Sequence, residues 1–205
     1  MLTYVTGNYG KYVSVKERFE KKGIKIEYFT CDLDEPDIND ISVISKAKAE
    51  FAYGKLSSPV FVMDSGFYIE AYPNLPGYPG AFVKRSGVSS NIRGLLETME
   101  NVQNRNCCFL DCLTYYDGIN YYQFFGESKG TLATTIKGSD KDKALSNLWK
   151  VFIPEGYSKT LAEMSDEELS ERRKNRVGAT DKFIEWYKEN IIRYYSIPGH
   201  RIMPF

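Results

Sequence analysis

The chain has 205 residues with 27 basic and 27 acidic side chains, so its formal net charge is zero, and it contains one histidine, His200. A neutral chain gives no reason to expect binding to nucleic acid or to an anionic membrane, and a single histidine disfavours a His-based catalytic triad or a multi-histidine zinc site. The hydrophobic fraction of 42% excludes a disordered chain and fits a globular protein of one large or two small domains.

The first third of the sequence predicts alternating strands and helices. Short apolar, β-branched runs predict strands at 2–6, 24–29 and 59–63. Apolar residues at helical spacing predict helices at 11–22 and 41–53. This order, β-α-β-α-β, is typical of a layered α/β protein.

The remainder of the chain predicts a different order of elements. Residues 64–87 hold three prolines and four glycines, which favours a long functional loop. A helix is expected at 88–100 and mostly helical structure at 165–195. Between them the sequence predicts three consecutive strands, at 107–116, 120–126 and 130–136, with Asp117-Gly118 and Ser128-Lys129 as turns. A mixed sheet with an antiparallel portion follows.

A first candidate site is the segment Thr6-Gly7-Asn8-Tyr9-Gly10-Lys11, which lies between a predicted strand and a predicted helix. Backbone N–H groups at the start of a helix form an anion site, and Lys11 adds a positive charge. A triphosphate would fit there, although the P-loop motif is absent. The alternative is an ordinary strand-to-helix turn.

A second candidate is a set of carboxylates. Asp64 follows the strand at 59–63, and an acidic loop follows the second strand, with Asp32, Asp34, Glu35 and Asp37. In an α/β layout both positions open on the same edge of the sheet, where ligands bind. Carboxylates that face a phosphate site suit Mg²⁺. The alternative is a solvated loop and a turn-capping aspartate.

A third candidate is the basic cluster Arg172-Arg173-Lys174-Asn175-Arg176, which follows the acidic run Asp166-Glu167-Glu168. The usual explanation of such a run is a solvated, salt-bridged helix face. The sharper interpretation is a contact to a phosphate or a base.

These motifs together resemble the inosine triphosphate pyrophosphatases. That family opens on Ser/Thr-Gly-Asn-x-x-Lys, which residues 6–11 fit fully. Its central acidic Asp-Ser/Thr-Gly segment with a following Pro-Gly is similar to Asp64-Ser65-Gly66 and Pro76-Gly77. Its Phe-x-Pro-x-Gly and Thr-x-Ala-Glu segments correspond to 152–156 and 160–163. The resemblance covers residues 2 to about 185.

The resemblance implies an elongated α/β fold with a mixed sheet, two lobes and a central cleft. It implies one domain over 1–196, with 197–205 as a C-terminal tail. The implied reaction is NTP + H₂O → NMP + diphosphate, with Mg²⁺ as cofactor and a nucleoside triphosphate as substrate. A homodimer is also implied. Because no secretory leader or membrane span is recognisable, we expect a cytoplasmic protein.

The resemblance also implies roles for single residues. Asp64 would be the general base or a metal ligand that activates water, and Asp37 would be the second metal ligand. Lys46 would correspond to the family's lysine on the helix that follows the acidic loop. The implied substrate-binding residues are Thr6, Gly7, Asn8, Tyr9, Gly10, Lys11, Lys46, Ser65, Trp149, Lys174, Asn175 and Arg176.

Three departures from the family pattern concern metal and base. The family carries two acids before Ser/Thr-Gly, and the first is Met63 here. Its purine-holding Phe-Gly-Tyr-Asp is replaced by residues 147–150, where Trp149 is left to stack. Its base-reading Ser-His-Arg aligns with Lys174-Asn175-Arg176, which keeps only the arginine.

Three hypotheses follow from these matches and departures. The first is a pyrophosphatase for deaminated purine nucleotides such as ITP, dITP or XTP. The second keeps the chemistry but changes the base, because an asparagine can pair with adenine. The third is a nucleotide-binding protein without catalysis on the same fold.

Overall fold

The computed structural model describes residues 2–32, 35–140, 144 and 146–192. The predicted tail at 197–205 and His200 lie outside the described residues. Among those described, no helix is long and apolar enough to cross a membrane. The elements in chain order are β1 (Leu2–Val5), α1 (Tyr9–Glu20), β2 (Ile26–Phe29), α2 (Ile41–Leu56), β3 (Val60–Ile69), β4 (Pro79–Gly80), α3 (Ile92–Thr98), β5 (Asn106–Tyr116), β6 (Tyr121–Leu132), the 3-10 helix η1 (Asn147–Lys150), β7 (Phe152–Pro154), α4 (Asp166–Lys174), α5 (Ala179–Tyr187) and the π-helical turn η2 (Lys188–Ile192).

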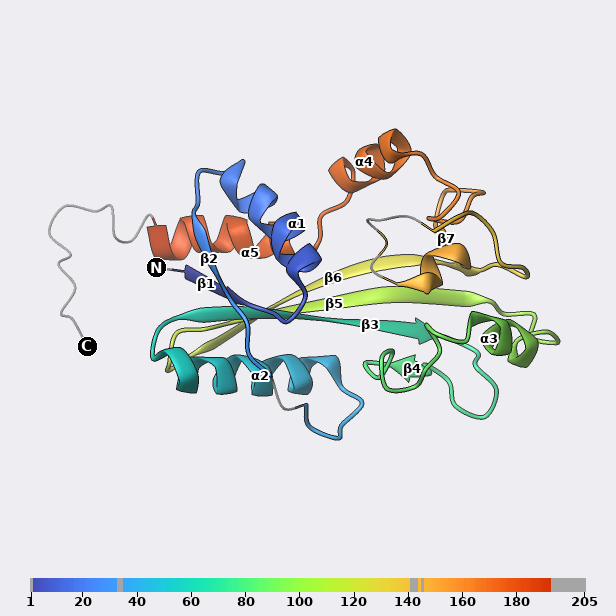
Figure 1. The fold of residues 1–205 in the computed structure, drawn as a ribbon, viewed down its shortest axis with the longest axis horizontal. Coiled ribbons are helices and arrows are strands. Elements are labelled where there is room, and N and C mark those ends of the chain that lie inside the picture. Colours follow the sequence, from blue (N-terminus) through green and yellow to red (C-terminus); the bar gives the residue numbers. More distant parts are fainter. Residues whose placement is uncertain (1, 33–34, 141–143, 145, 193–205) are drawn as a thin grey trace, which may run out of the picture.

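The strands form one mixed sheet in the order β2-β1-β3-β5-β6-β7, and β4 pairs with β3. β1 is parallel to both β2 and β3, whereas the pairs β3–β5, β5–β6 and β6–β7 are antiparallel. The predicted mixed α/β sheet is therefore confirmed. Three long strands, β3, β5 and β6, run along the length of the molecule (Figure 1).

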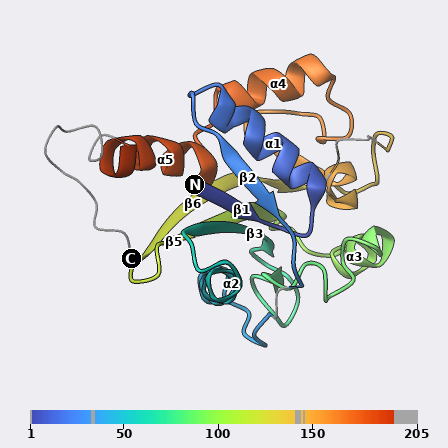
Figure 2. The same cartoon turned by 60° about the vertical axis from the view of Figure 1, so that its left-hand side comes forward.

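Helices cover both faces of this sheet. α2 lies on one face, and α1 and α5 lie on the other, as Figures 1 and 2 both show. The helices α1 to α4 each begin at a side chain that accepts a hydrogen bond from a backbone N–H of the first turn, whereas Gly178 before α5 has no such side chain. Asp40 caps α2, and Ser165 forms a capping box with Glu168 at the start of α4.

Three clusters of buried side chains form the core. The α1-side core joins α1 and α5 to the sheet through Phe19, Phe61, Leu113, Phe183 and others. The α2-side core packs Val60 and Val62 of β3 against Ala49 and Ala52 of α2. The distal core lies farther along the same strands, with Phe67, Ile69, Leu132, Leu148 and Phe152 among its members. Two lobes thus share the strands that connect them.

The sequence analysis was wrong about the lengths of two strands. β3 does not end at residue 63 but continues to Ile69, because it pairs with β5 at every position from Val60 to Ile69. β6 runs unbroken from Tyr121 to Leu132, so Ser128-Lys129 is not a turn. Continuous pairing with a neighbouring strand outweighs the weak strand propensity of glycine and serine. The Asp117-Gly118 hairpin turn is confirmed, with Gly118 at a φ of 100°.

The α1-side core gives a stability prediction. The Phe183 ring is fully buried and lies within 5.2–5.9 Å, between centroids, of the rings of Phe19, Phe61 and Phe124. Phe183→Ala is expected to lower the free energy of unfolding by about 3–5 kcal/mol, because it leaves a cavity between α5 and the sheet. Urea denaturation measures this. Ile119→Ala, at a side chain that is 76% exposed, is the control and should change stability by less than about 0.5 kcal/mol. Equal effects would contradict this view of the core.

Candidate active site at the open edge of β3

The site lies where one edge of β3 has no strand beside it. On that edge, β1 pairs with Val60 and Phe61 only, and β4 pairs with Phe67 and Tyr68. Residues 62–66 between them have no strand partner there in the described part of the chain. Side chains alternate between the two faces of a strand. Asp64 therefore points to the α2 face and Ser65 to the α1 face, and both lie beside the open edge.

The turn after β1 lies at this open edge. Asn8 caps α1 by accepting a hydrogen bond from the Lys11 N–H at 3.0 Å, and Thr6 Oγ1 accepts one from the Asn8 N–H at 3.2 Å. The space that a Cβ would fill at Gly7 has no atom within 4 Å. Lys11 Nζ donates to Ser65 Oγ at 3.3 Å. The start of α1, an open glycine and a lysine thus lie next to Ser65, the residue that follows Asp64. The Tyr9 side chain is 64% exposed.

On the α2 face, one lysine joins two carboxylates. Lys48 Nζ lies 2.5 Å from Asp64 Oδ1 and 2.7 Å from Glu35 Oε1. The side chains of Lys48 and Asp64 are only 12% and 16% exposed, so water screens this charge cluster weakly. α2 supplies the lysine, β3 one carboxylate and the acidic loop the other.

Glu35 and Lys48 shift each other's pKa in opposite directions. Burial raises the pKa of Glu35, but the hydrogen bond and charge of Lys48, together with Arg85, outweigh burial and leave that pKa below its usual value. Burial lowers the pKa of Lys48, but the charge of Asp64 and the hydrogen bonds to Asp64 and Glu35 leave it above its usual value. Glu35 therefore stabilises the folded protein above its unfolded-state pKa, and this contribution is lost as the pH falls through the lowered folded-state pKa.

Two predicted residues lie elsewhere. Lys46 Nζ sits 4.3 Å from the centroid of the Tyr121 ring, not at Asp64, because two residues along a helix turn the side chain by about 200°. Asp37 is 92% exposed and pairs with Arg85 at 2.9 Å. Glu35, two residues earlier, is the acid that reaches Lys48. An irregular loop has no periodicity from which the inward-facing acid could have been identified.

The basic cluster contributes two residues to the α1 face, Arg172, which donates to Ser128 Oγ of β6, and Arg176. Lys174 and Asn175 are exposed, whereas Arg176 donates from Nε to the Glu127 carbonyl at 3.1 Å and lies 3.6 Å from Asp111. Trp149 packs against the distal core. The Met63 sulfur, where the resembling family has an acid, lies 3.9 Å from Thr180 Oγ1 of α5.

Lys48 and Asp111 were not predicted from the sequence, and Glu35 was named only as one of four carboxylates in the acidic loop. Helical phase could have shown that Lys46 and Lys48 face opposite ways. Asp111 stands in the apolar run CCFLDCLTYY, and a charged residue on a buried strand face was the available signal.

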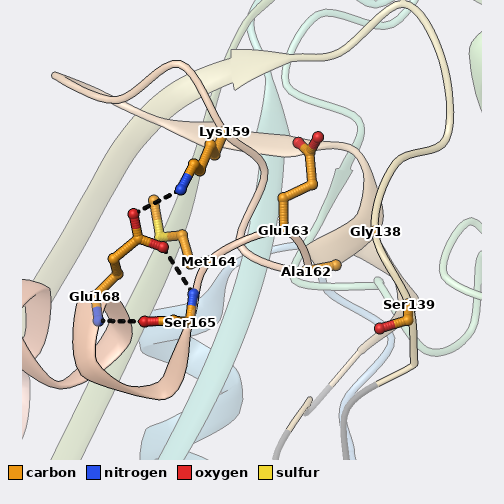
Figure 3. Close-up of a pocket in the computed structure, with 8 residues that line it drawn as sticks. All are labelled: Gly138, Ser139, Lys159, Ala162, Glu163, Met164, Ser165 and Glu168. Atoms are coloured by element: carbon orange, nitrogen blue, oxygen red, sulfur yellow. Dashed lines mark hydrogen bonds and ion pairs between the residues drawn. The ribbon is translucent and has the colours of Figure 1, made fainter.

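A pocket in the distal lobe is not part of this site. Figure 3 shows it between the loop at Gly138-Ser139 and the start of α4. Its charged groups are already paired with one another or with the backbone. Lys159 binds Glu168 at 2.8 Å, and Glu163 accepts from the Thr160 N–H at 2.8 Å. The pocket therefore offers no free charged group for chemistry among these residues.

The residues at the open edge fit a cation that needs few protein ligands. Asp64 Oδ2 is buried and has no hydrogen-bond partner among the described residues, and Glu35 stands on the other side of Lys48. Those residues contain no group of three or more His, Cys, Asp or Glu side chains that could hold a metal ion. Mg²⁺ commonly uses one or two carboxylates and completes its shell with water and substrate phosphates.

Comparisons with known proteins identify the relatives of this chain. Residues 2–186 match the sequence profile of the Ham1 family. The chain is 32% identical to the dITP/XTP pyrophosphatase of Saccharolobus solfataricus, over 89% of this chain and 91% of that one. It is also 32% identical to the dITP/XTP pyrophosphatase of Methanopyrus kandleri, over 92% of this chain and 96% of that one.

Solved structures show the same fold. A HAM1 protein from Coxiella burnetii superposes with a TM-score of 0.77 at 19% identity, over 92% of this chain and 100% of that one. The Ham1 protein of Staphylococcus aureus gives a TM-score of 0.74 at 19% identity, over 92% of this chain and 99% of that one.

The link between Lys48 and Glu35 can be tested by titration. Lys48→Met removes a hydrogen bond and a charge that lower the pKa of Glu35, so that pKa should rise. Carboxyl ¹³C NMR over a pH series measures the change. Lys46→Met removes the same charge from the other side of α2 and should leave the titration of Glu35 unaltered. A Glu35 pKa that is unchanged in Lys48→Met would contradict the contact between Lys48 and Glu35.

Proposed function

The chain belongs to the Ham1 family, and on that premise we propose that it is a nucleoside-triphosphate pyrophosphohydrolase acting on deaminated purine nucleotides such as dITP, ITP and XTP. The relatives named above bear out the resemblance to inosine triphosphate pyrophosphatases. The observation that carries the proposal is the meeting of Lys11, Asp64 and Glu35 at the open edge of β3. This arrangement offers carboxylates and hydrogen-bond donors for phosphate within one small region.

The chain's own groups suit hydrolysis at the α-phosphorus. The N–H groups at the start of α1 and the Lys11 ammonium would bind the triphosphate and stabilise charge on the departing diphosphate. Asp64 Oδ2, which has no hydrogen-bond partner among the described residues, would orient the attacking water or accept its proton. Lys48 would hold the carboxylates of Asp64 and Glu35 in place.

We include Mg²⁺ in this proposal, held by Asp64 and Glu35. When bound, Mg²⁺ would supply Lewis-acid stabilisation of the phosphate oxygens. Glu35 takes the ligand role that the sequence analysis gave to Asp37, because Glu35 is the acid that shares Lys48 with Asp64. The homodimer and the cytoplasmic location also belong to the proposal as expectations from the sequence.

A substrate screen tests the reaction. With Mg²⁺, the protein should release diphosphate from dITP and XTP at least about tenfold faster, by kcat/KM, than from dATP, because a purine 6-oxo group can accept a hydrogen bond from Arg176 and adenine lacks that group. Asp64→Asn should lower turnover of dITP by about 10²–10⁴-fold while the protein stays folded. Asp117→Asn, in the distant hairpin turn, is the control.

Each hypothesis has its own outcome in this screen. Preference for dATP would favour the altered-base hypothesis, and no diphosphate from any triphosphate would favour a non-catalytic nucleotide-binding protein. Full turnover by Asp64→Asn would show that the catalytic carboxylate lies elsewhere.

The choice between Glu35 and Asp37 has a separate test. Glu35→Gln should raise the Mg²⁺ concentration needed for half-maximal activity by about tenfold or more, because it removes a charged oxygen ligand. Asp37→Asn, two residues away in the same loop, should leave that concentration within about twofold. A larger effect from Asp37→Asn would return the ligand role to Asp37. The measurement is dITP hydrolysis across a Mg²⁺ titration.

A further inference from the structure

A polar pair interrupts the apolar α1 face of the sheet. On this face β3 presents Phe61, Met63 and Phe67, with Ser65 between the last two, and β5 presents Asp111 directly opposite Ser65. The α1-side core lies on one side of this pair and the distal core on the other. A carboxylate between two apolar clusters is costly unless it is paired, and such a position is uncommon without a function.

One carboxylate oxygen of Asp111 is the final acceptor in a chain of hydrogen bonds from Lys11 through Ser65. Asp111 Oδ1 accepts from Ser65 Oγ at 2.7 Å, and Ser65 Oγ accepts from Lys11 Nζ at 3.3 Å. A hydroxyl has one proton to donate. Because the carboxylate takes that proton, the lone pairs of Ser65 are left for the ammonium of Lys11. Asp111 is thereby linked, through Ser65, to a lysine that it does not touch.

The second oxygen of Asp111 faces a cation from another part of the chain. Arg176 Nη2 lies 3.6 Å from Asp111 Oδ2, which is ion-pair range but too long for a hydrogen bond. A close approach of α5 to β6 brings this segment to the sheet. A Cβ at Gly126, the β6 partner of Asp111, would lie 2.4 Å from the Ala179 backbone nitrogen.

The cations around Asp111 need a countercharge. Arg172 of α4 donates to Ser128 Oγ on β6, and burial, followed by the nearby charge of Arg176, lowers the pKa of Arg172. Lys11 and Arg176 reach the pair from opposite sides. Asp111 is the carboxylate that both of them share, directly in one case and through Ser65 in the other.

We propose that Asp111 is a positioning residue that orients Lys11 toward the phosphates of the substrate through the Ser65 hydroxyl. This inference rests on the proposed function, since it assumes that Lys11 binds phosphate. The positioning role predicts a change in anion binding opposite to the change that simple electrostatics predicts. Removal of a negative charge near a phosphate site should strengthen anion binding, whereas loss of the Asp111–Ser65 hydrogen bond should weaken it.

Calorimetry with inorganic triphosphate and Mg²⁺ tests this proposal without the base and without turnover. Asp111→Ala and Ser65→Ala should each weaken triphosphate binding about tenfold, and the double variant should be no weaker than either single one, since all three break the same chain. Asp111→Asn retains an acceptor for Ser65 and should bind within about threefold of the wild type. Asp117→Ala in the hairpin turn is the matched control.

The outcomes separate this inference from the proposed function. Tighter or unchanged binding by Asp111→Ala, additive losses in the double variant, or a wild type that binds no triphosphate would overturn the positioning role. A wild type that binds triphosphate but releases no diphosphate from dITP would overturn the proposed function and leave the positioning role standing. Thermal denaturation identifies any variant that is unfolded. If Asp111→Ala fails to fold, unchanged triphosphate binding by Ser65→Ala would still overturn the inference.

Discussion

Everything in the candidate site depends on β3 continuing past the end of β1. The ladder with β5 holds β3 extended through both lobes, and the other edge of β3 is open at residues 62–66. Because strand side chains alternate, two consecutive residues serve opposite faces: Asp64 meets Lys48 from α2, and Ser65 meets Lys11 from α1. A ligand at the open edge is within reach of both faces, so a single strand can bring together groups from two layers of helices.

The neutral overall charge conceals a local separation of charge. On the α2 face two carboxylates share one lysine, and on the α1 face one carboxylate faces an arginine directly and is linked to a lysine through Ser65. The acidic set suits a cation, and the basic set suits phosphate. Glycine has a part in this arrangement, because Gly126 lets the start of α5 approach β6 closely enough to place Arg176 over Asp111. Packing between a helix and the sheet thereby determines where a guanidinium lies.

Much of this could be predicted from the sequence, and the errors have physical causes. Local patterns and the Asp117-Gly118 turn predicted the mixed sheet, and the motif at residues 6–11 predicted a turn that the structure places beside Asp64. Residues 64–69 were mistaken for loop because glycine and proline nearby signal turns, whereas pairing with β5 is a long-range effect. The family resemblance pointed to Lys46 and Asp37, yet helix phase and loop conformation bring Lys48 to Asp64 and Glu35 to Lys48. Asp111 belongs to no motif, and its importance follows only from the register that sets it opposite Ser65.

We propose that groups at the open edge of β3 direct water to the α-phosphorus of a nucleoside triphosphate. Hydrolysis of dITP in ¹⁸O-enriched water, with mass spectrometry of both products, identifies the phosphorus that water attacks. Attack at the α-phosphorus predicts that the label appears in the nucleoside monophosphate and that the diphosphate is unlabelled. Label in the diphosphate, or release of orthophosphate as the first product, would contradict the account.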